Sequence, residues 1–160
     1  MTQEAIDEHQ KQIDALKHEW GEGPWNNEPD REDFRAHGLP CFVQRNNLGA
    51  WCGYVGVPPG HPMHGKDYNA TNDLDVHGGV TYSAACAHSI CHIPEPGEPD
   101  AVWWFGFDCA HAFDVVPGLN RWRPPEREQF GSIVGEHYRD LGFVRAETER
   151  LAAQVAGLGK

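Results

Sequence analysis

Residues 101–108 constrain the fold more than any other part of this sequence. They read AVWWFGFD, a run of β-branched and aromatic residues that follows the turn-forming stretch PEPGEPD. Successive side chains of a strand point to opposite faces, so Trp103 and Trp104 each begin an apolar row on a different face. Because both faces are apolar, both have to be covered. We therefore expect a central strand in a sheet that is packed on both sides.

Two segments carry apolar residues at helical spacing. Residues 3–19 contain good helix formers and end at GEGP, which predicts an N-terminal helix. Residues 138–156 carry apolar residues three and four apart among charged ones, which predicts a C-terminal amphipathic helix. A third, short helix is expected over residues 29–38, where Pro29 precedes DREDFRAH and Gly38 supplies a stop.

Strand-like runs between the helices complete the prediction. CFVQR and WCGYVGV flank NNLGA, whose residues tolerate positive φ, so residues 41–56 are expected to form a β-hairpin. DVHGGVTYS, residues 75–83, is expected to form a further strand with a bulge at its paired glycines. The fold class is therefore α+β: a small, mostly antiparallel sheet with an N-terminal helix and a C-terminal amphipathic helix.

A length of 160 residues fits one domain. We expect a single domain over 1–160, with a helical N-terminal extension over 1–39, sheet and pocket loops over 40–115, and the C-terminal helix over 138–156. The 18 glycines and 12 prolines exceed average usage, so shaped loops should form much of the chain. Loops of this kind often carry function.

Charge and hydropathy restrict the partners. A net charge of −11 argues against duplex nucleic acid, because binding its backbone requires a basic face. No apolar run reaches the roughly 18 residues that a membrane span needs. The first residues, MTQEAIDEHQKQ, lack the basic and apolar regions of a secretion signal. We expect a cytoplasmic protein with a small-molecule partner; the sequence leaves homo-oligomerisation open.

The five cysteines are an odd number in a chain large enough to fold without cross-links. They favour free thiols or metal ligands over a disulfide framework. CAHSICH and a second CAH suggest zinc, although their spacing is not that of a CxxC knuckle. The candidate zinc ligands are Cys86, His88, Cys91 and Cys109. A nucleophilic Cys109–His111 pair is conceivable, but buried, inert thiols are the preferred interpretation.

Histidines concentrate in the middle of the chain. Six of the ten lie between residues 61 and 111: His61, His64, His77, His88, His92 and His111. Imidazole titrates near neutral pH and binds metals, so such a cluster supplies acids, bases or ligands. The alternative is that each histidine only satisfies backbone groups of its loop.

Catalytic candidates lie at the predicted strands. Asp75 and His77 are two residues apart and would share one face of a strand as an acid–base unit, and His111 is the third candidate. No GxGxxG, Walker loop, HExxH or nucleophile elbow is present. The sequence therefore implies no organic cofactor. A divalent metal held by His77 and His111, with Asp75 or Asp108, stays open.

Candidate ligand-binding residues extend across the same region. Lys66 is the only cation between Arg45 and Arg121, so it is expected to hold an anionic group. Trp103 or Trp51 is expected to stack on a planar ligand. The full candidate set is His61, His64, Lys66, Tyr68, Asp75, His77, Thr81, Trp103, Asp108 and His111.

Several blocks together resemble a known group of proteins. They are GYVGVPPGHPMHGKDY, DVHGGVTYS, ICHIPEPGEPD and WWFGFDCAHAFD, followed by YRDLGFVRAETERLAAQVA. They are similar to a family of small proteins encoded by bacteriophages and bacteria, over roughly residues 50–156. This family brings no assigned catalytic residues. The resemblance implies a phage context, in which some small proteins with a shaped pocket sequester nucleotide signals of host immunity.

Three functional hypotheses follow. The first is a binding protein for a small polar, nucleotide-derived ligand, which acts against host defence in the host cytoplasm. The alternative is a metal-dependent hydrolase that uses the His/Asp cluster. The third is a structural or host-interaction protein whose histidines and tryptophans only shape loops. We favour the first, because planar aromatic residues are abundant and catalytic motifs are absent from the sequence.

Overall fold

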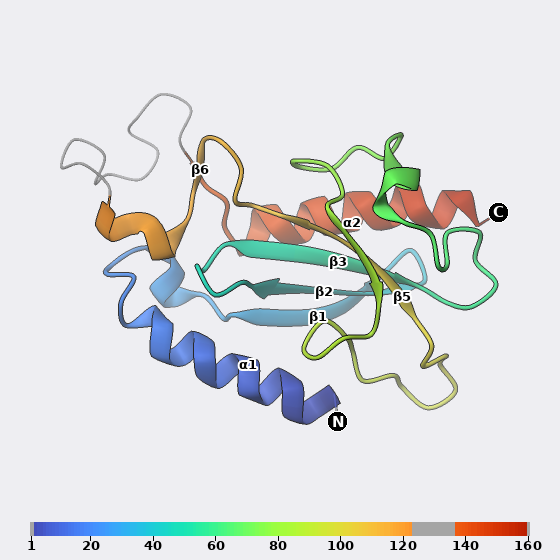
Figure 1. Cartoon of the computed structure of the whole chain (residues 1–160), viewed down its shortest axis with the longest axis horizontal. Coiled ribbons are helices and arrows are strands. Elements are labelled where there is room, and N and C mark those ends of the chain that lie inside the picture. Colours follow the sequence, from blue (N-terminus) through green and yellow to red (C-terminus); the bar gives the residue numbers. More distant parts are fainter. Residues whose placement is uncertain (1, 123–136, 160) are drawn as a thin grey trace.

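One antiparallel sheet organises the chain (Figure 1). The computed structural model describes residues 2–122 and 137–159. The strand order is β1-β2-β3-β5-β4. The strands are β1 (Arg31–Ala36), β2 (Leu39–Arg45), β3 (Trp51–Val57), β4 (Tyr82–Ala85) and β5 (Trp103–Asp108). The predicted α+β class, the hairpin formed by β2 and β3, and the strand β5 are confirmed.

The C-terminal helix α2 (Leu141–Leu158) covers one face of the sheet (Figure 1). It begins after Asp140, whose carboxylate accepts the N–H of Phe143 at 2.8 Å. Its buried residues Val144, Leu151 and Val155 pack with the sheet in the main core. Close approach depends on Gly53, because a Cβ there would lie 2.2 Å from Thr148 Oγ1. The predicted amphipathic helix is confirmed.

The opposite face carries a second apolar cluster. Phe42 stacks on Tyr54 with ring centroids 4.7 Å apart and meets Trp104 edge-on at 4.9 Å. Trp104 is fully buried here, whereas Phe105 is buried in the core under α2. The prediction that β5 is apolar on both faces is therefore confirmed. β5 lies between β3 and β4 and is therefore an interior strand, while β3 occupies the centre of the sheet.

The N-terminal helix α1 (Thr2–Lys17) was predicted correctly. Its Ile13 is fully buried against Trp20, Trp25 and Val115 in a third apolar cluster. Trp25 belongs to the short 3-10 helix η1 (Pro24–Asn27). The Nε2 of His9 lies 2.8 Å from the Arg45 carbonyl, so α1 also contacts the end of β2.

A buried ionic network joins these elements. The Arg45 side chain is 0 % exposed and donates to Asp30 at 2.8 Å and to Glu28 at 3.0 Å. Glu28 also accepts the N–H of Leu141 at 2.7 Å, where α2 begins. Lys17 of α1 donates to Asp30 at 2.9 Å. Burial raises the pKa of Asp30, but hydrogen bonds from Lys17, Gln10 and Arg45 outweigh it and hold that pKa below its usual value.

The short helix expected over residues 29–38 is wrong. Residues 31–36 form the edge strand β1, which pairs with β2 from Arg31–Gln44 to Ala36–Leu39. The turn explains the error: His37 and Gly38 have φ of 52° and 78°, as a two-residue hairpin turn requires. Gly38 is left-handed as predicted, but it reverses a hairpin and caps no helix. The N-terminal 39 residues are therefore only partly helical.

Two further short strands close the described fold. β6 (Asp114–Val115) and β7 (His137–Tyr138) pair in parallel. Between them lies the short 3-10 helix η3 (Pro117–Trp122), and another, η2 (Tyr68–Thr71), follows β3. Across the described ranges, none of the helices combines the length and apolar character needed to cross a membrane.

Candidate functional site

Asp114 is the centre of a cluster drawn from three separate segments. Its side chain is 0 % exposed, and its Oδ2 lies 2.8 Å from the Nε2 of His77. The backbone N–H of His111 donates to the same oxygen at 3.0 Å. Arg139 donates from Nε to Oδ1 at 2.9 Å. We call these four residues the Asp114 cluster.

Two side chains that bind Asp114 directly retain free hydrogen-bonding capacity. His77 uses Nε2 on Asp114, and its Nδ1 has no partner among the described residues and is not a buried orphan. Arg139 uses Nε on Asp114 while its guanidinium lies 4.8 Å from the Phe143 ring centroid. Its terminal nitrogens have no hydrogen bond within residues 2–122 and 137–159. A partly exposed imidazole and a partly exposed guanidinium therefore lie side by side on one buried carboxylate.

His111 connects this cluster to Asp108. The Nε2 of His111 lies 3.2 Å from Asp108 Oδ1, but the two groups are not aligned for a hydrogen bond, and Nε2 is buried. Its ring is 6.0 Å from that of His77, edge to face. Gly78, whose φ is 72°, packs closely against the His111 ring, because a Cβ at this position would lie 2.2 Å from the Nε2 of His111.

A hollow of about 230 Å³ adjoins Asp108. We call it the Asp108 hollow; its lining residues are Asn46, Cys52, Tyr54, Thr81, Tyr82, Phe107 and Asp108. The Thr81 hydroxyl donates to Asp108 Oδ2 at 3.4 Å. Burial raises the pKa of both Tyr54 and Tyr82 above its usual value. These phenols therefore stay protonated at neutral pH and can donate hydrogen bonds.

Comparison with family models, curated proteins and solved structures finds no match for this chain.

Four of the predicted binding residues meet here: His77, Thr81, Asp108 and His111. Sequence reasoning selected neither Asp114 nor Arg139. Pairing of β6 with β7 places Asp114 opposite His137 and so brings Arg139 to the carboxylate. No local pattern around Arg139 indicates this contact, because it depends on two segments that are distant in sequence.

The predicted Asp75–His77 unit is wrong. Gly78 and Gly79 both have positive φ, 72° and 79°, and Gly79 N–H closes a turn onto Val76, so no strand runs through these residues. Only the end of the predicted strand forms β4. The Asp75 side chain is 84 % exposed and accepts from Arg150 at 2.7 Å. It forms no hydrogen bond or ion pair with the described residues of the Asp114 cluster.

The loop of residues 58–68 lies at the other end of α2. His61 Nε2 lies 3.0 Å from the Val155 carbonyl, whereas His77 packs on Phe143. Twelve residues of helix separate those contacts, roughly 18 Å. His64 lies 2.8 Å from the Ala101 carbonyl. These two histidines satisfy backbone groups, which was the alternative interpretation of the cluster.

Three further predicted binding residues, Lys66, Tyr68 and Trp103, also lie at that end. Lys66 is exposed, and its carbonyl accepts from Trp103 Nε1 at 2.9 Å. Tyr68 is exposed on η2. Trp51 is fully buried beneath the Arg45 guanidinium, so it cannot stack on a ligand. The predicted pocket is thus divided between two sites.

The prediction for the cysteines is wrong in part. Cys86 and Cys91 form a disulfide, so neither offers a thiol to a metal. The thiols of Cys41, Cys52 and Cys109 are free and buried. Burial raises the pKa of Cys41 and Cys52 to about 12 and that of Cys109 further. These thiols are protonated at neutral pH, as the inert interpretation requires.

The candidate zinc ligands do not meet. His88 is exposed in the disulfide loop with φ 54°, while Cys109 is buried in the core under α2. Within the described ranges, no group of three or more His, Cys, Asp or Glu side chains is placed to hold a metal ion.

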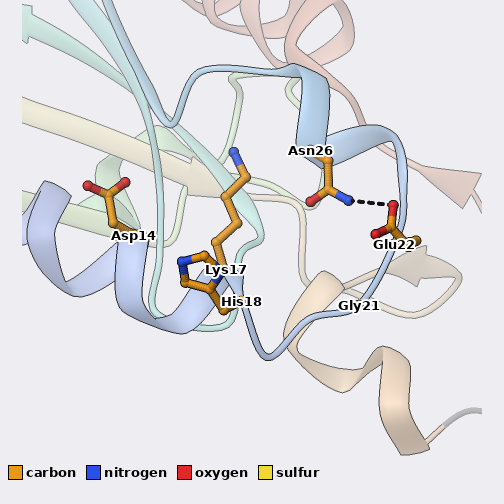
Figure 2. Close-up of a pocket in the computed structure, with 6 residues that line it drawn as sticks. All are labelled: Asp14, Lys17, His18, Gly21, Glu22 and Asn26. Atoms are coloured by element: carbon orange, nitrogen blue, oxygen red, sulfur yellow. Dashed lines mark hydrogen bonds between the residues drawn. The ribbon is translucent and has the colours of Figure 1, made fainter.

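A larger hollow, of about 620 Å³, lies at the end of α1 (Figure 2). Its lining residues are Asp14, Lys17, His18, Gly21, Glu22 and Asn26. Asn26 donates to Glu22 at 3.4 Å across one side of it. Lys17 is already bound to Asp30 and to the Glu28 carbonyl. None of the predicted site residues lines this hollow, so it is an alternative location for a bound ligand.

The Asp114 cluster should make stability depend on pH. Burial raises the pKa of Asp114, but hydrogen bonds from His77 and Arg139 outweigh it and hold that pKa below 3.8. As the pH falls, the Asp114 carboxylate is protonated in the unfolded chain before it is protonated in the folded protein. The stabilisation that it provides above pH 3.8 is therefore lost as the pH falls through its lower pKa in the folded state. The urea concentration at the midpoint of unfolding, measured from pH 6 to pH 2, should decrease at acid pH. This decrease should be smaller in Asp114→Asn. An unchanged slope in Asp114→Asn, matching the exposed control Asp75→Asn, would contradict this.

Proposed function

We propose that this protein binds a small polar, nucleotide-derived ligand at the Asp114 cluster and the adjoining Asp108 hollow, and that it sequesters such a signal from host defence. The observation that carries the proposal is the position of Arg139. Its partly exposed guanidinium lies beside His77 on the same buried carboxylate. Arg139 gives this site a cation, whereas Lys66, the only cation between Arg45 and Arg121, lies at the other end of α2.

Arginine suits a phosphate group for a geometric reason. Its planar guanidinium presents paired N–H donors that match two phosphate oxygens, and charge-assisted bonds of this kind are short and strong. Asp114 fixes the guanidinium through Nε, so the terminal nitrogens are pre-oriented with little further loss of side-chain freedom. His77 Nδ1 adds a donor or an acceptor beside them.

The Asp108 hollow suits the sugar or base. Asp108 and Thr81 supply an acceptor and a hydroxyl, and Tyr82 supplies a protonated phenol. At about 230 Å³ the hollow is smaller than the roughly 300–1,000 Å³ of typical ligand pockets, so it takes one ring or one sugar. The rest of the ligand would extend over the open surface at His77.

Phe113 supports a stacking contact outside the hollow. It lies between His111 and Asp114, holds a φ of 72°, and is 63 % exposed. A bulky residue rarely adopts this left-handed conformation, and large aromatic side chains are seldom left in solvent. In this proposal the exposed ring stacks on a base of the ligand, and such a contact typically contributes about 1–3 kcal/mol.

The metal-dependent hydrolase has no specific observation in its favour. The one carboxylate of the Asp114 cluster is already bound by the His77 ring, the backbone N–H of His111 and Arg139. In the part of the chain that the structure describes, they form no set of three ligands around a common point.

Ligand retention tests the proposal. The purified protein is incubated with a nucleotide-containing cell extract, washed and denatured, and the released small molecules are identified by mass spectrometry. Binding is then titrated with the dinucleotide 2′-deoxyadenylyl-(3′→5′)-adenosine as a defined probe. We expect Arg139→Gln to weaken binding about 10- to 100-fold, since a hydrogen bond to a charged group contributes roughly 1.5–3 kcal/mol and about 1.4 kcal/mol is tenfold.

Matched variants locate the site. Arg145→Gln is the control, because Arg145 contacts Glu32 and Glu149 and lies over Phe34, away from His77. His18→Ala probes the hollow at the end of α1. Equal affinity in Arg139→Gln and Arg145→Gln, or a loss confined to His18→Ala, would refute the proposed location. No retained nucleotide with the native protein would refute the function.

A further inference from the structure

We infer that this site also cleaves its ligand: His77 and His111 form a metal-independent acid–base pair for the phosphodiester bond that follows a ribose. This inference rests on the proposed function, because it takes a nucleotide-derived ligand with its phosphate at Arg139. It goes beyond binding by assigning a reaction, two catalytic residues and a substrate class.

Both imidazoles have Nε2 near a carboxylate, although only that of His77 forms a hydrogen bond with it. Each directs Nε2 toward its own carboxylate, His77 toward Asp114 at 2.8 Å and His111 toward Asp108 at 3.2 Å. Each leaves Nδ1 without a partner among residues 2–122 and 137–159, and neither Nδ1 is a buried orphan. With ring centroids 6.0 Å apart, the pair can present two proton-transfer groups to one small reacting centre.

The reaction needs one acid and one base at a single phosphorus. In a 3′,5′-linked ribonucleotide, the 2′-oxygen forms a bond to the adjacent phosphorus while the bond from phosphorus to the 5′-oxygen breaks. One imidazole takes the proton of the 2′-hydroxyl, and the other gives a proton to the leaving 5′-oxygen. The products are a 2′,3′-cyclic phosphate and a free 5′-hydroxyl. Atoms and charge balance without water, metal or a further reactant.

The carboxylates and Arg139 support this chemistry. Asp114 is ionised, fully buried and held by three donors, so it stabilises the positive charge that His77 carries as the acid. His111 has no aligned bond at Nε2 and is assigned as the base. The terminal nitrogens of Arg139 would face the non-bridging oxygens, where negative charge grows as the new bond forms.

The geometry of Gly78 positions the base. Its left-handed backbone lies directly against the His111 ring, so a side chain at this position would displace that ring. Gly78 touches no reacting atom; it is a positioning residue. Gly78→Ala should therefore lower the cleavage rate while binding of the 2′-deoxy dinucleotide changes less. Gly79→Ala, which has a similar φ of 79° and no close neighbour for a Cβ, is its control.

The test uses adenylyl-(3′→5′)-adenosine and its 2′-deoxy analogue, with products resolved by liquid chromatography and mass spectrometry. We expect adenosine 2′,3′-cyclic phosphate and adenosine from the ribo compound, none from the deoxy analogue, and the same rate with excess EDTA. His77→Asn and His111→Asn should each slow cleavage by about a hundredfold or more. His64→Asn, whose ring binds the Ala101 carbonyl at the other end of α2, should leave the rate unchanged.

Each outcome decides between the two proposals. Binding of the deoxy analogue without cleavage of the ribo compound overturns the acid–base pair and leaves the binding function standing. No binding of either overturns both. Cleavage that EDTA abolishes, or that persists in His77→Asn and His111→Asn, also overturns the pair, since it then comes from a metal or from a contaminating ribonuclease.

Discussion

Replacing Arg45 with alanine is expected to lower the free energy of unfolding by about 3–5 kcal/mol. The guanidinium is fully buried and binds Asp30, Glu28, the Gly49 carbonyl and the Tyr138 hydroxyl. Without it, Glu28 loses the cation with which it pairs and Asp30 keeps Lys17, so these largely buried carboxylates lose much of their charge compensation. Because small domains are stable by only about 5–15 kcal/mol, this loss approaches global unfolding. Urea denaturation followed by tryptophan fluorescence measures it.

Arg35→Ala is the matched control for Arg45. Arg35 lies on the neighbouring strand β1 and pairs with Glu98, but its side chain is 50 % exposed. An exposed pair of this kind contributes less than about 1 kcal/mol. Losses of similar size in the two variants would show that burial does not set the strength of the Arg45 network.

Leu151→Ala is expected to lower the free energy of unfolding by about 2–5 kcal/mol. Leu151 is 0 % exposed in the core between α2 and the sheet. The substitution removes buried methyl groups and leaves a cavity between two elements that cannot fully close on it. Alanine is the better helix former, so the loss cannot arise from helix propensity. Chemical denaturation of both proteins at pH 7 gives the difference.

Leu158→Ala provides the comparison within the same helix. Leu158 is the last residue of α2 and is 47 % exposed, so its replacement should change stability by less than about 0.5 kcal/mol. A large loss at Leu158, or a small one at Leu151, would contradict the assignment of the core to the sheet face of α2.

The candidate site was only partly predictable. The sequence pointed to His77 and His111 because histidines concentrate around them, and to Asp108 because it ends the strongest strand. It grouped His61, His64 and Lys66 with them because these residues are close along the chain. The structure separates the two sets, since the loop of residues 58–68 lies at the far end of α2. Closeness in the sequence therefore did not predict which of these residues lie together in the structure.

The error at Asp75 has a local cause. Two adjacent left-handed glycines turn the chain, so Asp75 and His77 diverge onto different partners, Arg150 and Asp114. The glycines were recognised as a break in the strand, but a bulge keeps the strand direction and a turn does not. Only the φ values decide between them.

Local sequence patterns were sufficient to predict the helices α1 and α2, the hairpin of β2 and β3, and the two apolar faces of β5. Those features depend on side-chain periodicity and turn residues within about ten positions, which act locally. Tertiary structure decided that residues 31–36 become an edge strand, that Cys86 bonds to Cys91, and that Asp114 gathers His77, His111 and Arg139. Contacts between segments remote in sequence depend on how the whole core packs, because closing such a loop loses chain entropy that only burial elsewhere offsets.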